Sequence, residues 1–151
     1  MNLTFKAYEE KDFNDLKEMV FGLYEEDPEG LPITADKIQN TIREMALHPE
    51  KIQIIMIQRG GAVIGYSILV FSWSNEYGGD IVDIDELYIK KDCRNKQAAS
   101  DFIKSRMTAY KNAVSLRLET TPSNADAERL YKRLGFEPSQ NNYMIRQMKN
   151  G

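Results

Sequence analysis

A run of isoleucine residues in the middle of the chain limits the folds that are open to it. Ile52–Ile57 is mostly β-branched, which is typical of a strand buried within a sheet. Residues 59–61 (Arg-Gly-Gly) predict a hairpin turn into a second strand, Ala62–Trp73. After a further turn, Ile81–Ile89 predicts a third strand. We therefore expect consecutive strands at the centre of a mostly antiparallel sheet.

Other segments have apolar residues at helical spacing, which predicts about four helices. These segments are Phe13–Leu23, Ile38–Met45, Ala98–Tyr110 and Ala127–Leu134. Asp12 and Thr34 stand where helix caps are expected. Asn124 is expected to open the last helix and Gly135 to end it.

Alternating apolar residues predict further strands near both ends of the chain. They lie at Leu3–Ala7 and Val114–Leu118, and Phe136 and Tyr143–Met148 are interpreted as closing strands. The expected order is β-α-α-β-β-β-α-β-α-β-β, a mixed sheet of about six to seven strands with helices on its faces. This order belongs to the α/β (α+β) class. With 151 residues and no linker or repeat, we expect a single domain over residues 1–151.

Composition excludes several classes of protein. No apolar run approaches the roughly 20 residues needed to span a bilayer. The segment 1–6 lacks the basic and then apolar order of a secretory signal. Cys93 is the single cysteine, so it forms no internal disulfide, and with one histidine a Cys/His zinc site within the chain is excluded. We expect a cytoplasmic protein with no metal and no membrane association.

The net charge of −3 conceals an asymmetry. Residues 1–50 carry 5 basic and 12 acidic side chains, whereas Leu87–Lys111 carries 7 basic and 2 acidic ones. An acidic chain is a poor candidate for bulk nucleic-acid binding, so we expect no such partner. The local basic segment favours one small polyanionic ligand, although ordinary surface variation explains the same counts.

The segment 84–99 has the order of an anion site. The strand Ile84–Ile89 leads through a short basic turn into a helix, whose free backbone N–H groups favour negative charge. Arg94 and Lys96 add positive side chains that suit a pyrophosphate. Basic turns are common between strands and helices, so this signal is weak by itself.

A second segment makes the interpretation more specific. The pattern Asn-x-x-Ala-x-x-x-Tyr-x-x-x-Gly-Phe is formed by Asn124, Ala127, Tyr131, Gly135 and Phe136. Together with the segment 84–99, this pattern resembles the GNAT superfamily of acetyl-CoA-dependent N-acetyltransferases, over essentially the whole chain. Within that superfamily, Ile84–Ile89 and residues 130–133 look most like the diamine (spermidine/spermine) and related small-amine acetyltransferases.

The cofactor-loop motif of the family, Arg/Gln-x-x-Gly-x-Gly/Ala, is matched in part. Arg94 and Ala99 fit, whereas Gln97 and Asn95 stand where the family usually has glycine. Glycine lets the backbone turn freely and approach phosphate oxygens closely. A left-handed conformation at Gln97 costs about 1–2 kcal/mol, and Asn95 tolerates it better. We expect this departure to affect acetyl-CoA affinity and to leave the fold unchanged.

The resemblance implies direct transfer of an acetyl group from acetyl-CoA to a primary amine, such as a small cationic amine. An alkylamine is neutral at pH 7 only to about one part in a thousand, so a carboxylate base is useful. By resemblance the base is Glu86 or Asp85, with Glu86 preferred, and Tyr131 protonates the departing thiolate. Alternation along the strand does not decide between the carboxylates, because family members carry a bulge there.

The resemblance also implies a set of cofactor contacts. The backbone of Leu87, Tyr88 and Ile89 pairs with the pantetheine arm as an added strand. The pyrophosphate is surrounded by the turn and the start of the helix, namely Arg94, Asn95, Lys96, Gln97, Ala98, Ala99 and Ser100. Asn124 holds the pantetheine amide region. Relatives are often dimers, so a homodimer is a further expectation.

Other interpretations stay open at this point. Tyr131 is also explained as a packing residue, and the acidic strand end at 83–86 as a solvated surface. The glycine-poor loop favours a catalytically weak CoA-binding or regulatory module. The acceptor is alternatively a protein lysine or N-terminus. The acidic loop at 25–27 attracts a cationic acceptor in one interpretation and is a solvated helix end in the other.

Overall fold

A computed structural model of the chain describes residues 2–28, 30–95, 97–121 and 124–149. The chain divides into two compact units, Met1–Glu119 and Thr120–Gly151. The first unit contains the sheet and most of the helices, and the second contains one helix and the C-terminal segment. Each unit is described by itself.

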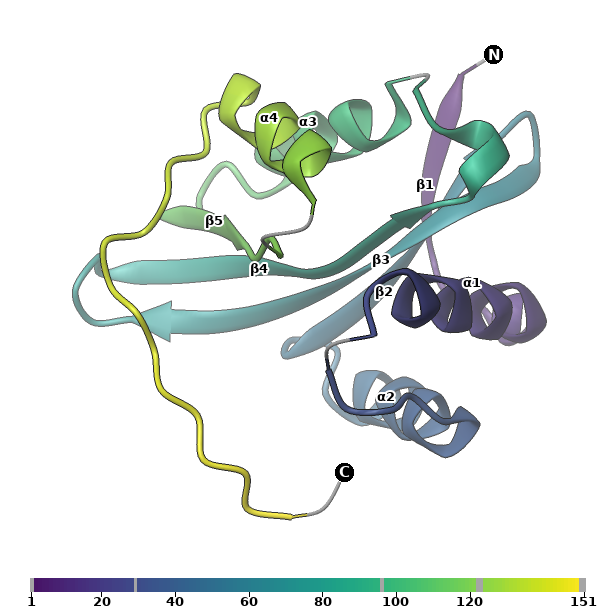
Figure 1. Cartoon of the computed structure of the whole chain (residues 1–151), viewed down its shortest axis with the longest axis horizontal. Helices are drawn as coiled ribbons and strands as arrows, with labels where there is room; N and C mark the ends of the chain where they lie inside the picture. Colours follow the sequence, from purple (N-terminus) through teal and green to yellow (C-terminus); the bar gives the residue numbers. More distant parts are fainter. Residues whose placement is uncertain (1, 29, 96, 122–123, 150–151) are drawn as a thin grey trace. The chain divides into compact units, whose positions relative to one another are not determined.

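A mixed sheet forms the centre of the first unit (Figure 1). Its strands lie in sequence order and are β1 (Leu3–Ala7), β2 (Ile52–Arg59), β3 (Ala62–Ser74), β4 (Gly79–Ile89) and β5 (Ser115–Leu118). The first four strands are antiparallel to their neighbours, and β5 runs parallel to β4. The predicted fold class and the mostly antiparallel mixed sheet are therefore confirmed.

The predicted helices are also confirmed. They are α1 (Phe13–Glu26), α2 (Ala35–Leu47), α3 (Ala98–Ala109) and, in the second unit, α4 (Ala125–Arg133), with single 3-10 turns η1 (Glu10–Asp12) and η2 (Lys91–Cys93). Thr34 caps α2, because its Oγ1 accepts the Lys37 N–H at 3.2 Å. The Asp12 carboxylate does not cap α1. It accepts hydrogen bonds from the Lys6 ammonium and the Glu9 N–H instead, and these close η1.

Helices cover both faces of this sheet (Figure 1). On one face, α1 and α2 bury a cluster with β2 and β3 that consists of Leu16, Met19, Val20, Ile38, Ile54, Met56, Tyr66 and Ile68. On the other face lies α3, whose Phe102 is fully buried and contacts the Phe5 ring edge-on at 5.4 Å. The apolar stripes of the helices thus explain their docking, since each stripe covers one face of the apolar strands.

The prediction of two closing strands at Phe136 and Tyr143–Met148 is wrong for the described residues. The sheet has five strands, and no strand is formed between residues 136 and 149. Tyr143, Met144, Ile145 and Met148 are mostly exposed. Alternation of apolar residues specifies a strand only where a neighbour pairs with its backbone, and no described strand does so here. Within the described ranges, no helix has both the length and the apolar content needed to cross a bilayer.

Candidate functional site

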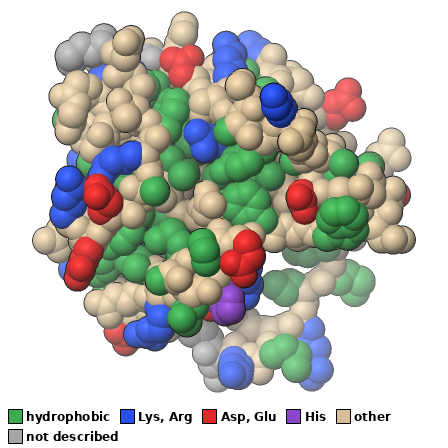
Figure 2. Space-filling model, turned by 180° about the vertical axis from the view of Figure 1, so that it is seen from behind, with side chains coloured by type: hydrophobic (Ala, Val, Ile, Leu, Met, Phe, Trp, Pro, Cys, Tyr) green, Lys and Arg blue, Asp and Glu red, His purple; other side chains and the backbone are tan. Residues whose placement is uncertain are grey.

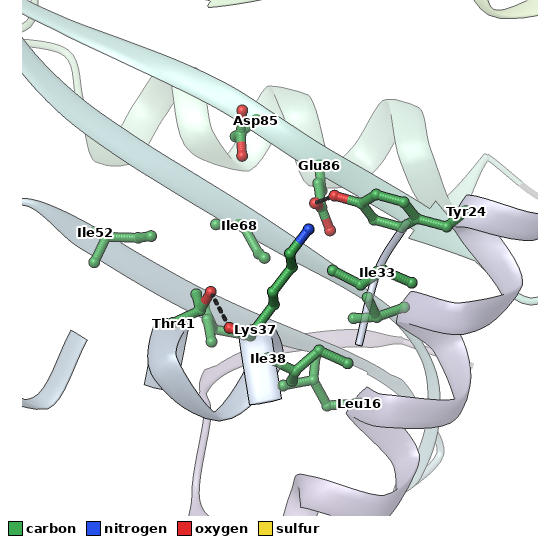
Figure 3. A pocket seen from close by; sticks show the side chains of 12 residues that line it. Leu16, Tyr24, Ile33, Lys37, Ile38, Thr41, Ile52, Ile68, Asp85 and Glu86 are labelled. Atoms are coloured by element: carbon green, nitrogen blue, oxygen red, sulfur yellow. Dashed lines mark hydrogen bonds between the residues drawn. The ribbon is translucent and has the colours of Figure 1, made fainter. Parts of the chain in front are cut away.

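A β-bulge in β4 brings two carboxylates to the same side of the sheet. Ile68 pairs with Glu86 and Leu69 pairs with Ile84, so Asp85 is the extra residue of β4 at this point. Adjacent residues of a regular strand point to opposite faces, and a bulge removes that alternation locally. Asp85 and Glu86 consequently line the same cavity (Figure 3). Counting along the sequence does not reveal this arrangement.

The cavity lies between the sheet and the helices α1 and α2. Its volume is about 240 Å³. Most of its wall is aliphatic, formed by Leu16, Val20, Ile33, Ile38, Ile54 and Ile68. Its polar lining includes Tyr24, Lys37 and Thr41 besides the two carboxylates. An apolar wall with a few converging polar groups is the usual form of a small-molecule site.

Two tyrosines hold the Glu86 side chain. The Tyr24 hydroxyl donates to Glu86 Oε2 and the Tyr66 hydroxyl to Oε1, each at 2.7 Å. Burial, followed by the hydrogen bond to Glu86, raises the pKa of Tyr24, and burial followed by the Glu86 charge raises the pKa of Tyr66. Both phenols therefore remain protonated donors at neutral pH. The Ser67 hydroxyl also donates to the Glu86 carbonyl oxygen at 2.7 Å, which fixes the backbone of the bulge.

Asp85 lies in a different environment from Glu86. Its side chain keeps an exposed side, but loss of water around the carboxyl group raises its pKa. The negative charges of Glu86, Glu119 and Asp83 add to this effect. A carboxyl group with a raised pKa accepts a proton more readily at neutral pH. The two adjacent carboxylates thus differ: two hydroxyl groups hold Glu86, whereas Asp85 has a raised pKa.

The pairing between β4 and β5 ends next to this bulge. The ladder joins Ile81–Ile84 of β4 to Ser115–Leu118 of β5, and β4 then continues to Ile89 without β5 beside it. The β5 side of the backbone at Leu87, Tyr88 and Ile89 is therefore left unpaired by that strand. This divergence is the geometry that an added strand of ligand requires.

The turn after β4 has a strained backbone at the two positions where the family usually has glycine. Asn95 and Gln97 have φ angles of 65° and 63°, in the left-handed region that favours glycine. Gln97 immediately precedes α3, whose N-terminus has no side-chain cap. The backbone N–H groups of Ala98, Ala99 and Ser100 thus begin a helix that fits an anion. Lys96 lies outside the described residues.

Several side chains anchor Arg94 in this turn. Its Nε donates to the Ile89 carbonyl at 2.7 Å, and its guanidinium lies 5.2 Å from the centre of the Tyr88 ring. Its Nη2 donates to Glu26 at 2.9 Å, and Lys91 lies 3.9 Å from the same carboxylate. Glu26, the last residue of α1, is therefore part of an ion-pair network.

Opposite charges also mix elsewhere on the surface. On the face drawn in Figure 2, Lys and Arg side chains alternate with Asp and Glu side chains, and neither sign forms a continuous area. The acidic neighbours of Glu26, namely Glu25 in α1 and Asp27 directly after it, line a second cavity of about 420 Å³ with Phe21 and Leu31. Tyr24 and Ile33 line both cavities. The acidic segment 25–27, expected as a loop, is thus the end of α1, and it combines an ion-paired residue with cavity-lining ones.

The second unit contains the other motif residues. Asn124 Oδ1 accepts the Ala127 N–H at 3.2 Å and so caps α4. Gly135 has a φ of 96° and ends the helix turn, after which the Phe136 ring packs against Tyr131 at 6.0 Å. Burial raises the pKa of the Tyr131 hydroxyl, so this hydroxyl stays protonated at neutral pH. The spacing of the motif thus has a local structural basis.

Sequence reasoning missed Tyr24, Tyr66 and Lys37. Tyr24 follows Leu16 and Val20 at helical spacing, and this spacing was the signal that could have placed its ring toward the sheet. Tyr66 stands in the middle of an apolar strand, where a buried hydroxyl requires a hydrogen-bond partner. The need for such a partner was the one signal in the sequence that could have indicated a role for Tyr66. In the described part of the chain, no group of three or more His, Cys, Asp or Glu side chains is placed to hold a metal ion.

Comparison with known proteins assigns the chain to a family. The model of the Acetyltransferase (GNAT) family matches residues 13–136, and the chain therefore belongs to this family. The family uses acetyl-CoA, and its general reaction is acyl transfer. No curated protein sequence matches the chain.

Solved structures with the same fold include several acetyltransferases. One described as a possible acetyltransferase from Clostridium difficile 630 has a TM-score of 0.80 and 20% identity, covering 99% of this chain and 100% of that one. An aminoglycoside N-acetyltransferase in complex with CoA has a TM-score of 0.76 and 16% identity, covering 98% and 96%. A ribosomal-protein-alanine N-acetyltransferase from Brucella melitensis biovar Abortus 2308 has a TM-score of 0.72 and 16% identity, covering 97% and 100%. At these identities the likeness concerns the fold.

Proposed function

We propose that this chain is an N-acetyltransferase that transfers the acetyl group of acetyl-CoA directly to the primary amine of a small cationic molecule. The observation that carries the proposal is the bulge at Asp85. Because of this bulge, two adjacent carboxylates line the same largely aliphatic cavity. Carboxylates attract an ammonium group, and the aliphatic wall accommodates the methylene groups that carry it. A volume of about 240 Å³ suits a small acceptor.

The two carboxylates have different roles in this proposal. Glu86 is oriented by the hydroxyls of Tyr24 and Tyr66, so it binds and positions the ammonium group of the acceptor. Asp85, whose raised pKa brings it closer to neutral pH, removes the proton that the amine loses before attack. This assignment reverses the preference for Glu86 as the base that the sequence resemblance suggested.

We assign the acetyl donor to the open edge of β4 and to the turn that follows this strand. It supplies an acetyl thioester, whose carbonyl carbon is the target of the amine. We assign its pantetheine arm to the open backbone edge of Leu87, Tyr88 and Ile89. Its pyrophosphate is assigned to Arg94 and to the start of α3, with backbone N–H groups as donors. Tyr131, whose hydroxyl is protonated at neutral pH, donates the proton that the departing thiolate needs.

Release of free CoA thiol across a panel of amines tests this function. We expect amine-dependent release from the wild-type chain, and a loss of about 100-fold or more in kcat for Asp85→Asn. Tyr131→Phe is expected to bind acetyl-CoA normally and to lose most of its turnover. Asp80→Asn is the matched control, because Asp80 is exposed on the same strand, does not line the cavity and is not among the charges that raise the pKa of Asp85. Unchanged turnover in Asp85→Asn would remove Asp85 from the mechanism.

One observation favours a second function, a CoA-binding module with weak catalysis. Asn95 and Gln97 hold left-handed conformations that cost free energy, in the turn proposed to bind pyrophosphate. Thermal shift with acetyl-CoA separates the two functions when it is combined with the amine panel. Binding of acetyl-CoA without thiol release on any amine, or on any lysine-containing peptide, would favour the module.

A further inference from the structure

Lys37 places an amine of the chain itself in the acceptor cavity. It lies in the first turn of α2 and lines the same cavity as Asp85 and Glu86. In Figure 3 its side chain rises from α2 and its nitrogen is directed toward Glu86. The cavity proposed to bind a cationic amine therefore already contains one.

The anchoring of this ammonium group leaves it able to move. Lys37 Nζ donates to the Pro32 carbonyl at 2.7 Å, and Pro32 lies in an exposed loop. A carbonyl oxygen is a neutral partner, so this hydrogen bond does not neutralise the lysine charge. The flexible four-carbon stem of lysine allows the nitrogen to leave the carbonyl and approach the carboxylates.

The stem of Lys37 lies between the start of α2 and the aliphatic wall of the cavity. Lys37 stands three residues after the Thr34 cap, at the positive end of the α2 macrodipole. Aliphatic side chains of the cavity, such as Ile33 and Ile38, replace part of the water around its stem. Acetylation removes the charge, and the neutral amide that it forms is compatible with both surroundings.

We propose that Lys37 is an internal acetyl acceptor, so that the chain acetylates its own Lys37 Nζ. This inference rests on the function proposed above, because acetyl-CoA is the donor. The ammonium group of Lys37 first gives one proton to the Asp85–Glu86 pair. The neutral nitrogen then attacks the thioester carbonyl, an amide N–C bond forms and the C–S bond breaks. As the amide forms, the nitrogen loses a second proton, and the thiolate takes up this proton and leaves as free CoA.

The modification changes the charge of the cavity. Before acetylation the cavity contains one lysine and two carboxylates, and afterwards it contains the carboxylates alone as charged groups. A cationic acceptor then meets a more negative site. Self-acetylation of Lys37 thus increases the affinity of the cavity for a small cationic amine.

Isotopically labelled acetyl-CoA, incubated with the purified full chain without added amine, tests the inference. Peptide mass spectrometry measures the rate of label incorporation at each lysine. We expect Lys37 to be acetylated at least about tenfold faster than the exposed Lys104 on α3, which reports uncatalysed acetylation. An intramolecular reaction also gives a fractional rate that does not depend on protein concentration.

Substitutions of the cavity carboxylates test whether acetyl labelling of Lys37 depends on the cavity. Asp85→Asn and Glu86→Gln are expected to slow labelling at Lys37 and to leave labelling at Lys104 unchanged. Asp80→Asn, at an exposed position on the same strand outside the cavity, is expected to leave both rates unchanged. Circular dichroism and thermal unfolding establish that each variant is folded. Because Lys37→Arg removes the acceptor nitrogen, it is expected to lose the fast phase of label incorporation.

The outcomes separate this inference from the proposed function. Labelling of Lys37 no faster than that of Lys104, or a rate that rises with protein concentration, overturns the inference. If amine-dependent thiol release is present in that case, the acetyltransferase function stands. If acetyl-CoA binds but neither label nor thiol release appears, both proposals are overturned. Labelling that is equally fast in folded Asp85→Asn and Glu86→Gln would also contradict the role of the cavity.

Discussion

Arg94 donates to the Glu26 carboxylate at 2.9 Å and thereby joins the end of α1 to the turn that precedes α3. Tyr24, which holds Glu86 in the acceptor cavity, lies two residues before Glu26 on the same helix. The ion pair thus connects the helix that lines the acceptor cavity with the turn proposed to bind pyrophosphate. A polyanion that binds at this turn competes with Glu26 for the guanidinium group of Arg94.

Glu26→Gln should therefore strengthen the binding of acetyl-CoA. Removal of one negative charge beside Arg94 is worth about 1 kcal/mol near a protein surface, which is roughly a fivefold lower Kd. The gain should decrease as salt is added, because salt screens exposed charges. The free energy of unfolding should change by less than about 1 kcal/mol, since the pair is partly exposed. Isothermal titration calorimetry measures the Kd.

Glu44→Gln is the matched control for this change. Glu44 forms an ion pair with Lys51 at 2.6 Å, outside the turn, so its loss should leave the Kd unchanged. A weaker affinity in Glu26→Gln would mean that Glu26 positions Arg94 for the ligand instead of competing with it.

Gln97→Gly should stabilise the fold and tighten acetyl-CoA binding. Gln97 has a φ of 63°, and a left-handed conformation costs a non-glycine residue about 1–2 kcal/mol. Part of that gain is lost because glycine has more conformational freedom in the unfolded chain. We expect a net increase of about 0.5–1 kcal/mol in the free energy of unfolding, measured by urea denaturation. The same substitution should lower the Kd for acetyl-CoA, since the backbone no longer carries a side chain beside the phosphates.

Gln39→Gly distinguishes relief of strain from a general effect of glycine. Gln39 is an exposed residue within α2, where glycine costs about 1 kcal/mol relative to good helix formers. The two substitutions should therefore shift stability in opposite directions. A loss of stability in both would show that the conformation of Gln97 is not strained.

Local patterns in the sequence predict much of the fold, because they act over a few residues. Helical spacing identified α1 to α4, and the isoleucine run with its turns identified β2 to β4. The cost of a left-handed conformation at Gln97 was considered from the family glycines, and the structure shows that conformation at both Asn95 and Gln97. The closing strands were not correctly predicted, because the pairing of residues 136–149 depends on neighbours that the sequence does not name.

The site was less accessible to sequence reasoning, because its contacts join distant residues. Tyr24 and Glu86 are 62 positions apart, and Tyr66 and Glu86 are 20 apart. The bulge depends on how Ile68 and Leu69 of β3 pair with β4, which alternation within β4 does not contain. The sequence therefore indicated the two carboxylates but not that they share a cavity.

The activity should fall on the acidic side with an apparent pKa above the ordinary range of aspartate. The fold raises the pKa of Asp85, through burial first and neighbouring carboxylates second. A base must be deprotonated to act, so kcat/KM should rise as the pH rises through that value. The pH profile of thiol release measures it. Asp85→Asn should abolish this fall in kcat/KM at acidic pH. If the fall persists unchanged in the variant, it belongs to the titration of another group.

The same pKa shift has a consequence for stability. A carboxyl group whose pKa is higher in the folded state than in the unfolded state binds protons more tightly when folded. The wild-type chain therefore loses stability as the pH rises from the unfolded to the folded pKa of Asp85. The asparagine side chain in Asp85→Asn carries no charge at any pH, so this variant should be more stable than the wild type at pH 7. The difference should vanish below about pH 3, where the wild-type carboxyl is protonated in both states. Urea denaturation at both pH values measures it, and a difference independent of pH would contradict the raised pKa.

Tyr66→Phe should destabilise the fold more than Tyr24→Phe. Both hydroxyls donate to Glu86 at 2.7 Å, but Tyr66 is fully buried and Tyr24 is only half-buried. Water cannot easily replace the buried donor, so loss of the Tyr66 hydroxyl should cost about 1–3 kcal/mol in the free energy of unfolding. Water can reach the place of the Tyr24 hydroxyl, so that loss should cost about 0.5–1.5 kcal/mol. Tyr110→Phe serves as the control, because its hydroxyl makes only a long contact of 3.5 Å with Gln53. Equal losses in Tyr66→Phe and Tyr110→Phe would mean that the hydrogen bond to Glu86 does not stabilise the fold.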